Sequence, residues 1–394
     1  MELLDCPIQS YDWGSRTAIA RLQGRPQPAS GPEAELWVGA HHRAPSLLGD
    51  ERTLVDRIAA DPVGELGPAV VDRFGPTLPF LLKVLGVDAP LSIQVHPDRE
   101  QAEAGYAAEE ASGVPLGAPE RNYKDRWPKP ELLVALTPFA ALCGFRDPAG
   151  AARLIEALDV PQLAPVAHCL RAHGTAAVRQ ALGTLLRWPS TERAGLVEAI
   201  AAGAGRLAAG GDPAARWYAR LADAHPGDAG VAAALLLNVV ELAPGESVVM
   251  PTGNLHAYLQ GTGVEIMANS DNVLRGGLTS KHVDVDDLLR VADVRACDVP
   301  VLRPVLAGDE VVYPAPFDEF RLSAVDVAGR PVALDRRGPQ LLLAVAGSVT
   351  VRAGDSSLAL TGGRAAYVGA SEPAVVIEGE GAVFRATPGL PYRN

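Results

Sequence analysis

The sequence predicts a mainly β protein that is interrupted by one α-helical segment, and three observations support this fold class. Residues 1–147 contain short apolar runs separated by proline or glycine, which is typical of short antiparallel strands. Residues 149–234 are rich in alanine, leucine and arginine, and their apolar residues recur with helical spacing. Residues 301–394 return to strand-like runs with a turn about every eight to ten residues, which favours a sandwich or jelly roll.

Length and composition limit the possible classes of protein. A chain of 394 residues suggests about two or three domains, and 48% hydrophobic residues suffice for a sizeable core. The 35 lysines and arginines against 47 aspartates and glutamates give a net charge of −12, which argues against nucleic acid or an anionic membrane as a partner. The chain also lacks an apolar run of roughly 18 residues and a secretory signal pattern. We therefore expect a cytoplasmic protein without a membrane partner.

The individual elements follow from local signals. Ser190–Glu192 and Asp212–Pro213 are predicted helix starts in a segment of about four helices. After this segment we expect strands at Ala233–Val240 and Ser247–Met250, and a short helix at Val285–Ala292 capped by Asp284 or Asp286. Four strands are expected earlier in the chain, at Glu35–Val38, Leu78–Leu85, Pro90–His96 and Glu131–Leu136.

The last part of the chain is expected to contain strands only. The runs QLLLAVAG, SVTVRAG, SLALTGG, RAAYVGA, AVVIEG and AVFRAT each predict one strand. No histidine follows His282, so an imidazole-based metal site is excluded from this part.

Several cysteines and histidines fit ordinary structural roles. The four cysteines, Cys6, Cys143, Cys169 and Cys297, are scattered without a C-x-x-C pair, so we expect buried small side chains rather than disulfides or a thiolate zinc site. His41 and His42 are adjacent and cannot both face one ion from a strand, so we expect surface or supporting roles. Three histidines of the helical segment are expected to be solvated: His168, His173 and His225.

The first candidate site is the run LSIQVHP, residues 91–97. Because side chains alternate along a strand, Ser92, Gln94 and His96 share one face, opposite three aliphatic side chains. This pattern fits an edge exposed to water, and it also fits the inner wall of a barrel that holds a polar site.

Two further fragments carry polar groups beside apolar strands. Lys129 and Glu131 precede the run Leu132–Val134, an odd place for a solvated carboxylate. Asn254, His256 and Tyr258 follow a turn, and their alternation puts them on one strand face. Each fragment alone is explained as well by a structural role.

Together these fragments supply a possible ligand set. Gln94, His96, Glu131 and His256 offer one amide, two imidazoles and one carboxylate, which suit Zn²⁺ and also Fe²⁺ or Mn²⁺. A single carboxylate leaves a divalent ion with residual positive charge, which suits a Lewis acid acting on hydroxyl or carbonyl oxygens.

The segment Glu265–Lys281 is rich in Asn, Ser, Asp and Gly, which predicts a loop. A solvated turn would explain it. The segment also carries Arg275 and Lys281 in an acidic protein, and these cations could hold a phosphate or stabilise a developing oxyanion.

These motifs together resemble the type I mannose-6-phosphate isomerase family. The matching residues are LPFLLKVL…LSIQVHP (78–97), NYKD…KPEL (122–132), NVVELAPGE…PTGNLHAYLQG…VEIMANSDNVLRGGLTSKHVDV (238–285), ELWVGAHHRAPS (35–46) and QSYDWGS (9–15). The match covers most of residues 1–147 and 235–292, in chain order. The helical segment and the last 90 residues match only in placement and general character.

The resemblance implies a fold, a cofactor and a reaction. The fold would be a cupin or jelly-roll β-barrel formed by residues 1–147 and 235–300, with a helical insert at 148–234 and a second, degenerate cupin at 301–394. One Zn²⁺ per chain would be bound by Gln94, His96, Glu131 and His256. The reaction would interconvert mannose 6-phosphate and fructose 6-phosphate through a cis-enediol(ate). We expect a monomer whose partner is the sugar phosphate.

The resemblance also implies residue roles. It places Arg275 in the active site, where we expect it to face the developing enediolate. Lys129 or Asp271 is the expected proton-transfer group, and Lys281 or Lys83 the expected phosphate ligand. Ser92 is expected beside the substrate.

One position departs from the family pattern. Family members usually carry a histidine directly before the lysine of the Lys-Pro-Glu run, and this chain has Pro128 there. A mechanism that uses that histidine as the base cannot operate in this protein, whereas the expected metal ligand Glu131 is intact.

Two other functions compete with the isomerase. His96, Glu131 and His256 form a two-histidine, one-carboxylate set of the kind that Fe²⁺ oxygenases use, although Gln94 would then fill a position that oxygen needs. A sugar-phosphate sensor would keep the pocket and lack turnover, and the missing histidine at position 128 is consistent with it.

Overall fold

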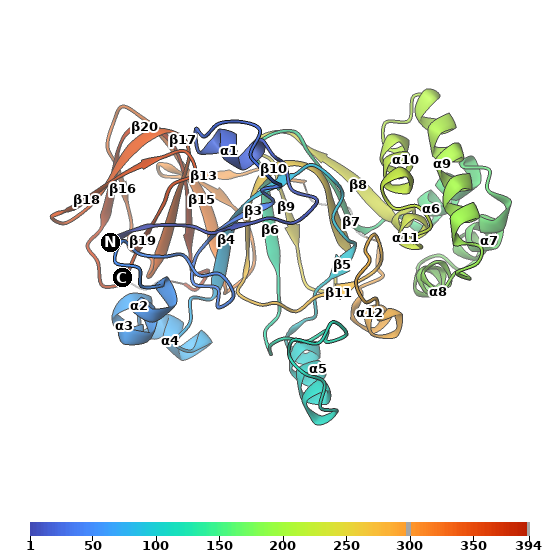
Figure 1. Cartoon of the computed structure of the whole chain (residues 1–394), viewed down its shortest axis with the longest axis horizontal. Coiled ribbons are helices and arrows are strands. Elements are labelled where there is room, and N and C mark those ends of the chain that lie inside the picture. Colours follow the sequence, from blue (N-terminus) through green and yellow to red (C-terminus); the bar gives the residue numbers. More distant parts are fainter. Residues whose placement is uncertain (297–300, 392–394) are drawn as a thin grey trace.

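The computed structural model describes residues 1–296 and 301–391. Within these residues an 11-stranded and a 9-stranded sheet lie side by side, with a group of helices beyond the 11-stranded sheet (Figure 1). This arrangement confirms the mainly β fold class with a helical insert. The division into three domains stays a prediction, and its boundary at residue 300, its end at residue 394 and Cys297 lie outside the described residues.

β10 is the central strand of the 11-stranded sheet and runs from His256 to Ala268. Its first part pairs with β5 and β7, its second part pairs with β4 and β6, and the register shifts between Tyr258 and Gln260. Gly261 follows this shift at φ +131°, where a Cβ would lie 2.6 Å from Cδ2 of Phe139. Glycine is therefore needed at the point where the strand passes from one set of partners to the other.

The predicted N-terminal strands are largely confirmed. They form β3 (Glu35–Val38), β4 (Phe80–Val87) and β6 (Glu131–Ala135), whereas Pro90–His96 contributes only the short β5 (Gln94–Val95). Ser247–Met250 forms β9 as predicted. The sheet also contains β2 (Ile8–Gln9), β7 (Phe139–Phe145), β8 (Leu237–Leu242), β11 (Leu274–Arg275) and β12 (Val301–Leu302).

Apolar side chains cover both faces of the central strands. All eight residues of β4 are buried, with Leu82 and Val84 in one apolar cluster and Leu85 and Val87 in another. The aliphatic face of β5 is covered by the helical insert, because Ile93 and Val95 belong to its apolar core. Of the two explanations for LSIQVHP, the structure thus favours the inner wall of a polar site over an edge exposed to water.

The helical insert has more helices than predicted. Its helices are α6 (Pro148–Ala157), η1 (Pro161–Leu163), α7 (Ala164–His173), α8 (Thr175–Leu186), α9 (Arg193–Ala209), α10 (Ala215–Ala224) and α11 (Gly230–Ala234). The prediction that a strand begins at Ala233 is wrong, since α11 includes Ala233 and β8 begins at Leu237. Residues 229–237 are buried throughout, and an apolar run buried on every side has no period that separates helix from strand.

Five helices in the first part of the chain were not expected. They are α1 (Ala18–Leu22), α2 (Leu54–Ala60), α3 (Pro62–Leu66), α4 (Pro68–Phe74) and α5 (Arg99–Ala111). Local caps start them: Thr53 and Asp98 each form a capping box, and Asp61 caps a helix that begins with a proline. α12 (Val285–Val291) confirms the predicted helix, with the Asp284 side chain at its N-cap. None of the helices in the described residues combines the length and apolar character needed to cross a membrane.

The 9-stranded sheet is formed by β13–β20 together with the first strand of the chain. β1 (Glu2–Leu4) pairs with β19 (Ala365–Val368). The prediction of separate short strands is wrong in two places, because β17 (Gln340–Ala353) and β20 (Val375–Thr387) each join two predicted strands. The remaining strands are β13 (Val305–Ala307), β14 (Glu310–Tyr313), β15 (Arg321–Ala328), β16 (Val332–Leu334) and β18 (Ser356–Thr361).

The glycines of β17 and β20 explain that error. Gly347 pairs with Gly381, and a Cβ on Gly347 would lie 2.1 Å from the carbonyl oxygen of Glu380. These glycines allow two backbones to approach closely within the sheet, next to a register shift between Ala344 and Ala346. The glycines at which the sequence predicted turns therefore lie inside continuous strands.

The stability of the 9-stranded sheet is expected to depend on Arg385. This fully buried arginine pairs with Glu310 (2.7 Å) and Asp335 (2.9 Å) and donates to Gln340 (2.8 Å). Arg385→Ala should lower the free energy of unfolding by about 3–5 kcal/mol, because buried Glu310 loses its nearer cation and keeps the more distant Arg321 at 3.5 Å. Urea unfolding followed by circular dichroism measures this loss.

Arg352 provides the matched control on the same sheet. Its guanidinium pairs with Glu378 at 3.0 Å, and both side chains are exposed. Arg352→Ala should cost less than about 1 kcal/mol. Equal losses in the two variants would show that burial of the Arg385 network is not what stabilises the sheet.

Candidate metal centre and substrate cavity

Three buried side chains from distant parts of the chain converge on one point. His96 follows β5, Glu131 begins β6 and His256 begins β10. Nε2 of His96 lies 3.3 Å from Oε1 of Glu131, and Nε2 of His256 lies 3.3 Å from Oε2. Each of the three residues is at most 2% exposed, and one ligand atom from each lies within 4.8 Å of the others.

The hydrogen bonds of the two imidazoles leave their Nε2 atoms directed at this point. Nδ1 of His96 lies 2.7 Å from the carbonyl oxygen of Asn272, and Nδ1 of His256 lies 3.0 Å from that of Asn254. A carbonyl only accepts, so Nδ1 carries the proton and Nε2 presents a lone pair. Both Nε2 atoms and Oε2 of Glu131 are buried without a hydrogen-bond partner. A cation at this point would satisfy all three atoms, so the donor set fits a metal ion.

Gln94 stands next to this group. It pairs across the sheet with His256 on one side and with Arg275 on the other, and it lines the cavity described below. Cross-strand partners have Cβ atoms about 5 Å apart. The pairing with β11 also corrects the prediction of one loop over 265–281, because Glu265–Ala268 ends β10 and Leu274–Arg275 forms β11.

Burial and nearby charges favour the protonation states in which His96 and Glu131 can bind a metal ion. Burial lowers the pKa of His96 to about 4, with the nearby Lys129 cation acting in the same direction, so this imidazole is neutral at pH 7. Burial alone would raise the pKa of Glu131, but the Lys129 cation holds it well below its ordinary value. Nζ of Lys129 lies 3.0 Å from Oε1 of Glu131.

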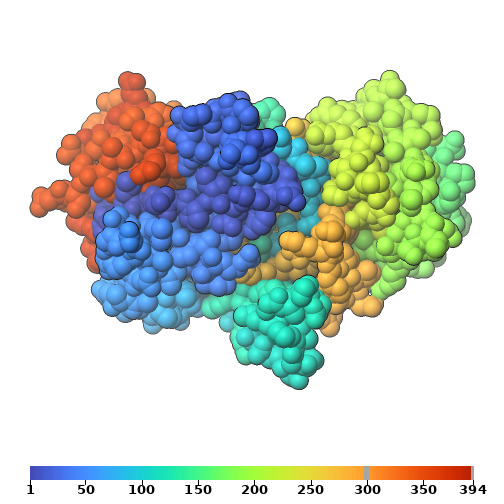
Figure 2. Space-filling view, in the orientation of Figure 1, coloured from blue at the N-terminus to red at the C-terminus, as the bar shows by residue number. Residues whose placement is uncertain are grey.

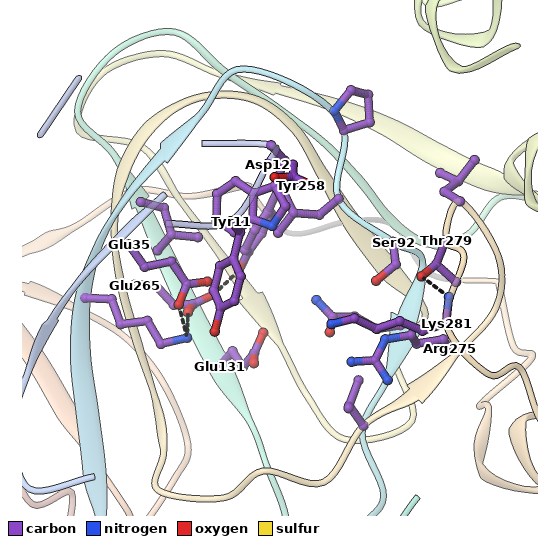
Figure 3. A pocket seen from close by; sticks show the side chains of 18 of the residues that line it. Tyr11, Asp12, Glu35, Ser92, Glu131, Tyr258, Glu265, Arg275, Thr279 and Lys281 are labelled. Carbon is purple, nitrogen blue, oxygen red and sulfur yellow. Dashed lines mark hydrogen bonds and ion pairs between the residues drawn. The ribbon is translucent and has the colours of Figure 1, made fainter. Parts of the chain in front are cut away.

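A cavity of about 630 Å³ opens beside the group and is lined by most of the predicted site residues. Figure 3 shows two opposing walls, with Ser92, Arg275, Thr279 and Lys281 on one and Glu35, Glu131 and Glu265 on the other. The predicted residues that line it are Lys83, Ser92, Gln94, Lys129, Glu131, Asp271, Arg275 and Lys281. His96 and His256 lie behind this lining.

The wall with Arg275 and Lys281 carries positive charge that is not neutralised locally. Neither side chain has an ion-pair partner within the described residues. Burial lowers the pKa of Arg275, and burial together with the charge of Arg275 lowers that of Lys281. Two cations that destabilise each other are arranged to receive an anion.

The opposite wall contains a buried ion network whose carboxylates, Glu35 and Glu265, were not predicted as site residues. Nζ of Lys83 lies 3.0 Å from Glu265 and 3.5 Å from Glu35. Tyr258 donates to Glu265 (2.8 Å), and Trp37 donates to Glu35 (2.5 Å). Burial alone would lower the pKa of Lys83, but the carboxylates raise it above its ordinary value. A signal was present in the sequence, since Lys83 and Glu265 are charged residues inside apolar strands.

Asp271 lies in a separate cluster at the cavity wall. His41 and His42 each place Nε2 3.5 Å from its carboxylate, and Nη1 of Arg43 is also 3.5 Å away. Burial alone would raise the pKa of Asp271, but His41 and Arg43 hold it well below its ordinary value. The supporting role expected for His41 agrees with this placement.

The cluster around Asp271 is better explained by hydrogen bonds than by a metal. The backbone N–H of Arg43 donates to Nδ1 of His41, so Nε2 of this imidazole carries the proton and faces the carboxylate. The guanidinium of Arg43 also adds positive charge next to Asp271.

Two positions differ from expectation in their surroundings. His225 was expected to be solvated, but it lines the cavity and hydrogen-bonds the backbone of Pro90, whereas His168 and His173 are exposed as predicted. Pro128, which replaces the usual family histidine, lines a separate small hollow with Phe74 and does not line the cavity.

Comparisons with known proteins agree with this site. Residues 1–148 match the model of the catalytic domain of type I phosphomannose isomerase. The mannose-6-phosphate isomerase of Escherichia coli (strain K12) is 38% identical, covering 98% of this chain and 99% of the relative. The human mannose-6-phosphate isomerase is 32% identical, covering 94% and 93%.

Solved structures give the same result. A mannose 6-phosphate isomerase bound with zinc and yttrium superposes with a TM-score of 0.91 at 36% identity, covering 99% of this chain and all of that one. The apo form from Salmonella typhimurium gives a TM-score of 0.91 at 36% identity, covering 99% of each chain. With relatives this similar over nearly its whole length, the chain belongs to the type I phosphomannose isomerase family.

Proposed function

We propose that this protein is a zinc-dependent aldose–ketose isomerase that interconverts mannose 6-phosphate and fructose 6-phosphate through a cis-enediol(ate). The observation that carries the proposal is the pairing of two features in one cavity. Among the described residues, three buried ligand atoms lack hydrogen-bond partners on one side, and Arg275 and Lys281 lack ion-pair partners on the other. We also propose that the protein acts as a cytoplasmic monomer.

Gln94, His96, Glu131 and His256 would hold one Zn²⁺ per chain. A bound zinc ion supplies a Lewis acid that polarises a sugar oxygen. The surroundings keep these protein ligands in their deprotonated forms at pH 7, because burial lowers the pKa of His96 and the Lys129 cation lowers the pKa of Glu131.

The phosphate is assigned to the wall that carries Lys281. The alternative, Lys83, is already paired with Glu265 and Glu35, and a phosphate there would meet two carboxylates. Ser92 lies on the same wall as Lys281 and provides a hydroxyl for the substrate. This assignment places the phosphate across the cavity from Glu131.

The isomerisation moves one proton from C2 of the open-chain sugar to C1, while O1 gains a proton and O2 loses one. We assign the carbon proton transfer to Lys129, which lines the cavity and contacts Glu131. Asp271 is the weaker candidate because its carboxylate is occupied by His41 and Arg43. Arg275 would face the developing enediolate, whose negative charge a guanidinium stabilises.

The competing functions gain no support from the site. Gln94 stands beside His256, where an oxygenase would need an open position. Pro128 lies outside the cavity lining, so its substitution for histidine leaves the cavity wall unchanged.

The first test is turnover and its dependence on metal. Proton NMR of mannose 6-phosphate in D₂O should show fructose 6-phosphate and deuterium at the exchanged carbon. Chelation should abolish this conversion and added zinc should restore it, because three buried ligand atoms then regain a partner. Tight binding of zinc and substrate without any conversion would reject the enzyme and support the sensor.

The second test concerns Lys129. Lys129→Met should lower kcat by about 100-fold or more while zinc content stays unchanged, since Lys129 contacts Glu131 but is not among the proposed ligands. Lys124→Met is the matched control, because Nζ of Lys124 donates to the carbonyls of Leu116 and Ala118 outside the cavity lining. A wild-type kcat in Lys129→Met would end this assignment.

The third test separates the two phosphate candidates. Lys281→Met should raise KM for mannose 6-phosphate by about tenfold or more with little change in stability, since Lys281 forms no ion pair in the part of the chain that the structure describes. Lys83→Met should instead lower the free energy of unfolding by about 3–5 kcal/mol, because Glu265 and Glu35 lose their buried partner. Steady-state kinetics and urea unfolding on both variants decide between them.

A further inference from the structure

We propose that Asp228, in the helical insert, is a positioning residue for the phosphate side of the substrate cavity. It fixes residues 276–281, here called the phosphate loop, and thereby sets where Lys281 stands relative to the metal ligands. This inference rests on the proposed function, because it takes the loop to receive the sugar phosphate. Asp228 itself is not part of the cavity lining, so it acts through the loop.

Hydrogen bonds connect Asp228 to Lys281 in two steps. Asp228 lies between α10 and α11, and its Oδ1 accepts from the backbone N–H of Gly230 at 2.7 Å. Its Oδ2 accepts from the backbone N–H of Thr279 at 2.9 Å. The hydroxyl of Thr279 in turn accepts from the backbone N–H of Lys281 at 3.1 Å (Figure 3). One carboxylate thus joins the helical insert to the loop that carries the cation.

Close backbone packing supports the same contact between the helical insert and the phosphate loop. A Cβ on Gly277 would lie 2.4 Å from Cα of Gly230, and a Cβ on Gly230 would lie 2.5 Å from the backbone nitrogen of Leu278. The two glycines therefore let the insert and the phosphate loop touch directly. In the space-filling view, the amber segment that contains this loop lies against the yellow-green end of the insert (Figure 2).

The loop itself has an unusual backbone that its surroundings must hold. Gly277 has φ +111° and Leu278 has φ +56°, which is uncommon for leucine. On its other side the loop is bonded to Ile93 of the strand region, through N–H of Gly276 (2.8 Å) and the carbonyl of Gly277 (3.0 Å). The phosphate loop is therefore held between the metal-bearing strand and the helical insert.

Space behind the loop explains why this support matters. Lys281 and Thr279 line both the substrate cavity and a second hollow of about 450 Å³ that also contains Asp228 and Gly230. Without the bond from Asp228, the end of the loop has room to move into this hollow. Lys281 would then retreat from the phosphate, and phosphate binding would weaken while the metal ligands stay in place.

Kinetics of Asp228 variants test the proposal. Asp228→Ala should raise KM for mannose 6-phosphate by about tenfold and weaken competitive inhibition by inorganic phosphate by a similar factor, with kcat within about threefold of wild type and unchanged zinc content. Asp228→Asn keeps one acceptor oxygen, so its KM and its inhibition constant for phosphate should lie between those of the wild type and Asp228→Ala. Asp223→Ala, an exposed aspartate of the same helical segment, is the matched control.

A second pair of variants tests the backbone contact without touching a polar group. Gly230→Ala should push the phosphate loop away and raise the same KM and inhibition constant, since its Cβ has no room. Gly205→Ala is the control, because a Cβ at this exposed position of α9 meets no atom within 4 Å. Thermal unfolding of all variants identifies any that fail to fold.

The outcomes separate this inference from the proposed function. Absence of isomerisation in the wild-type protein would reject the function. Wild-type isomerisation with unchanged KM and phosphate inhibition in folded Asp228→Asn and Gly230→Ala would overturn the positioning role alone. A fall in kcat at constant KM would overturn it as well, since that result points to the reaction centre rather than to phosphate binding.

Discussion

The buried group of His96, Glu131 and His256 is the constraint on which the rest of the site depends. A carboxylate inside a protein is costly unless charges or hydrogen bonds compensate it, and Lys129 compensates only one oxygen of Glu131. Nε2 of His96 faces Oε1 and Nε2 of His256 faces Oε2, each with its lone pair, so the arrangement without a cation is repulsive. A cation removes this repulsion. The three strand ends that meet here are consequently held in place by what binds between them as well as by their own packing.

The electrostatics of the cavity follow from that constraint. On the metal side, Glu35, Glu131 and Glu265 outnumber Lys83 and Lys129, so local charge favours a cation and disfavours a phosphate. In the proposed function the phosphate is therefore assigned to the opposite wall, where the positive charge of Arg275 lowers the pKa of Lys281. In this proposal one sugar phosphate would contact both walls, with its carbonyl end at the metal side and its phosphate at the loop. Binding would then favour substrates that carry both groups.

The sequence predicted the parts of this site that have a local pattern. Alternation along a strand identified Gln94, His96 and His256, and the position of a carboxylate at the start of an apolar strand identified Glu131. Other parts depend on contacts that no local pattern contains. His225 reaches the cavity only because the insert folds back onto Pro90, and β11 exists only because β5 lies beside it. Glu265 was visible as a charge in an apolar strand, but only the pairing of β10 with β4 shows that Lys83 is its partner.

The helical insert supports the site because of its position in the chain. It connects β7 to β8, which are paired neighbours, so it enters and leaves the sheet at one place. Arg146 fixes this exit by donating to Leu237 and to Tyr218 of the insert. The insert also completes the core behind β5, because Ile93 and Val95 pack among its helices. The strand that carries Gln94 and leads to His96 is thus supported from behind by the same segment whose Asp228 holds the phosphate loop. A shift of the insert would therefore affect both β5 and the phosphate loop, because the insert contacts both.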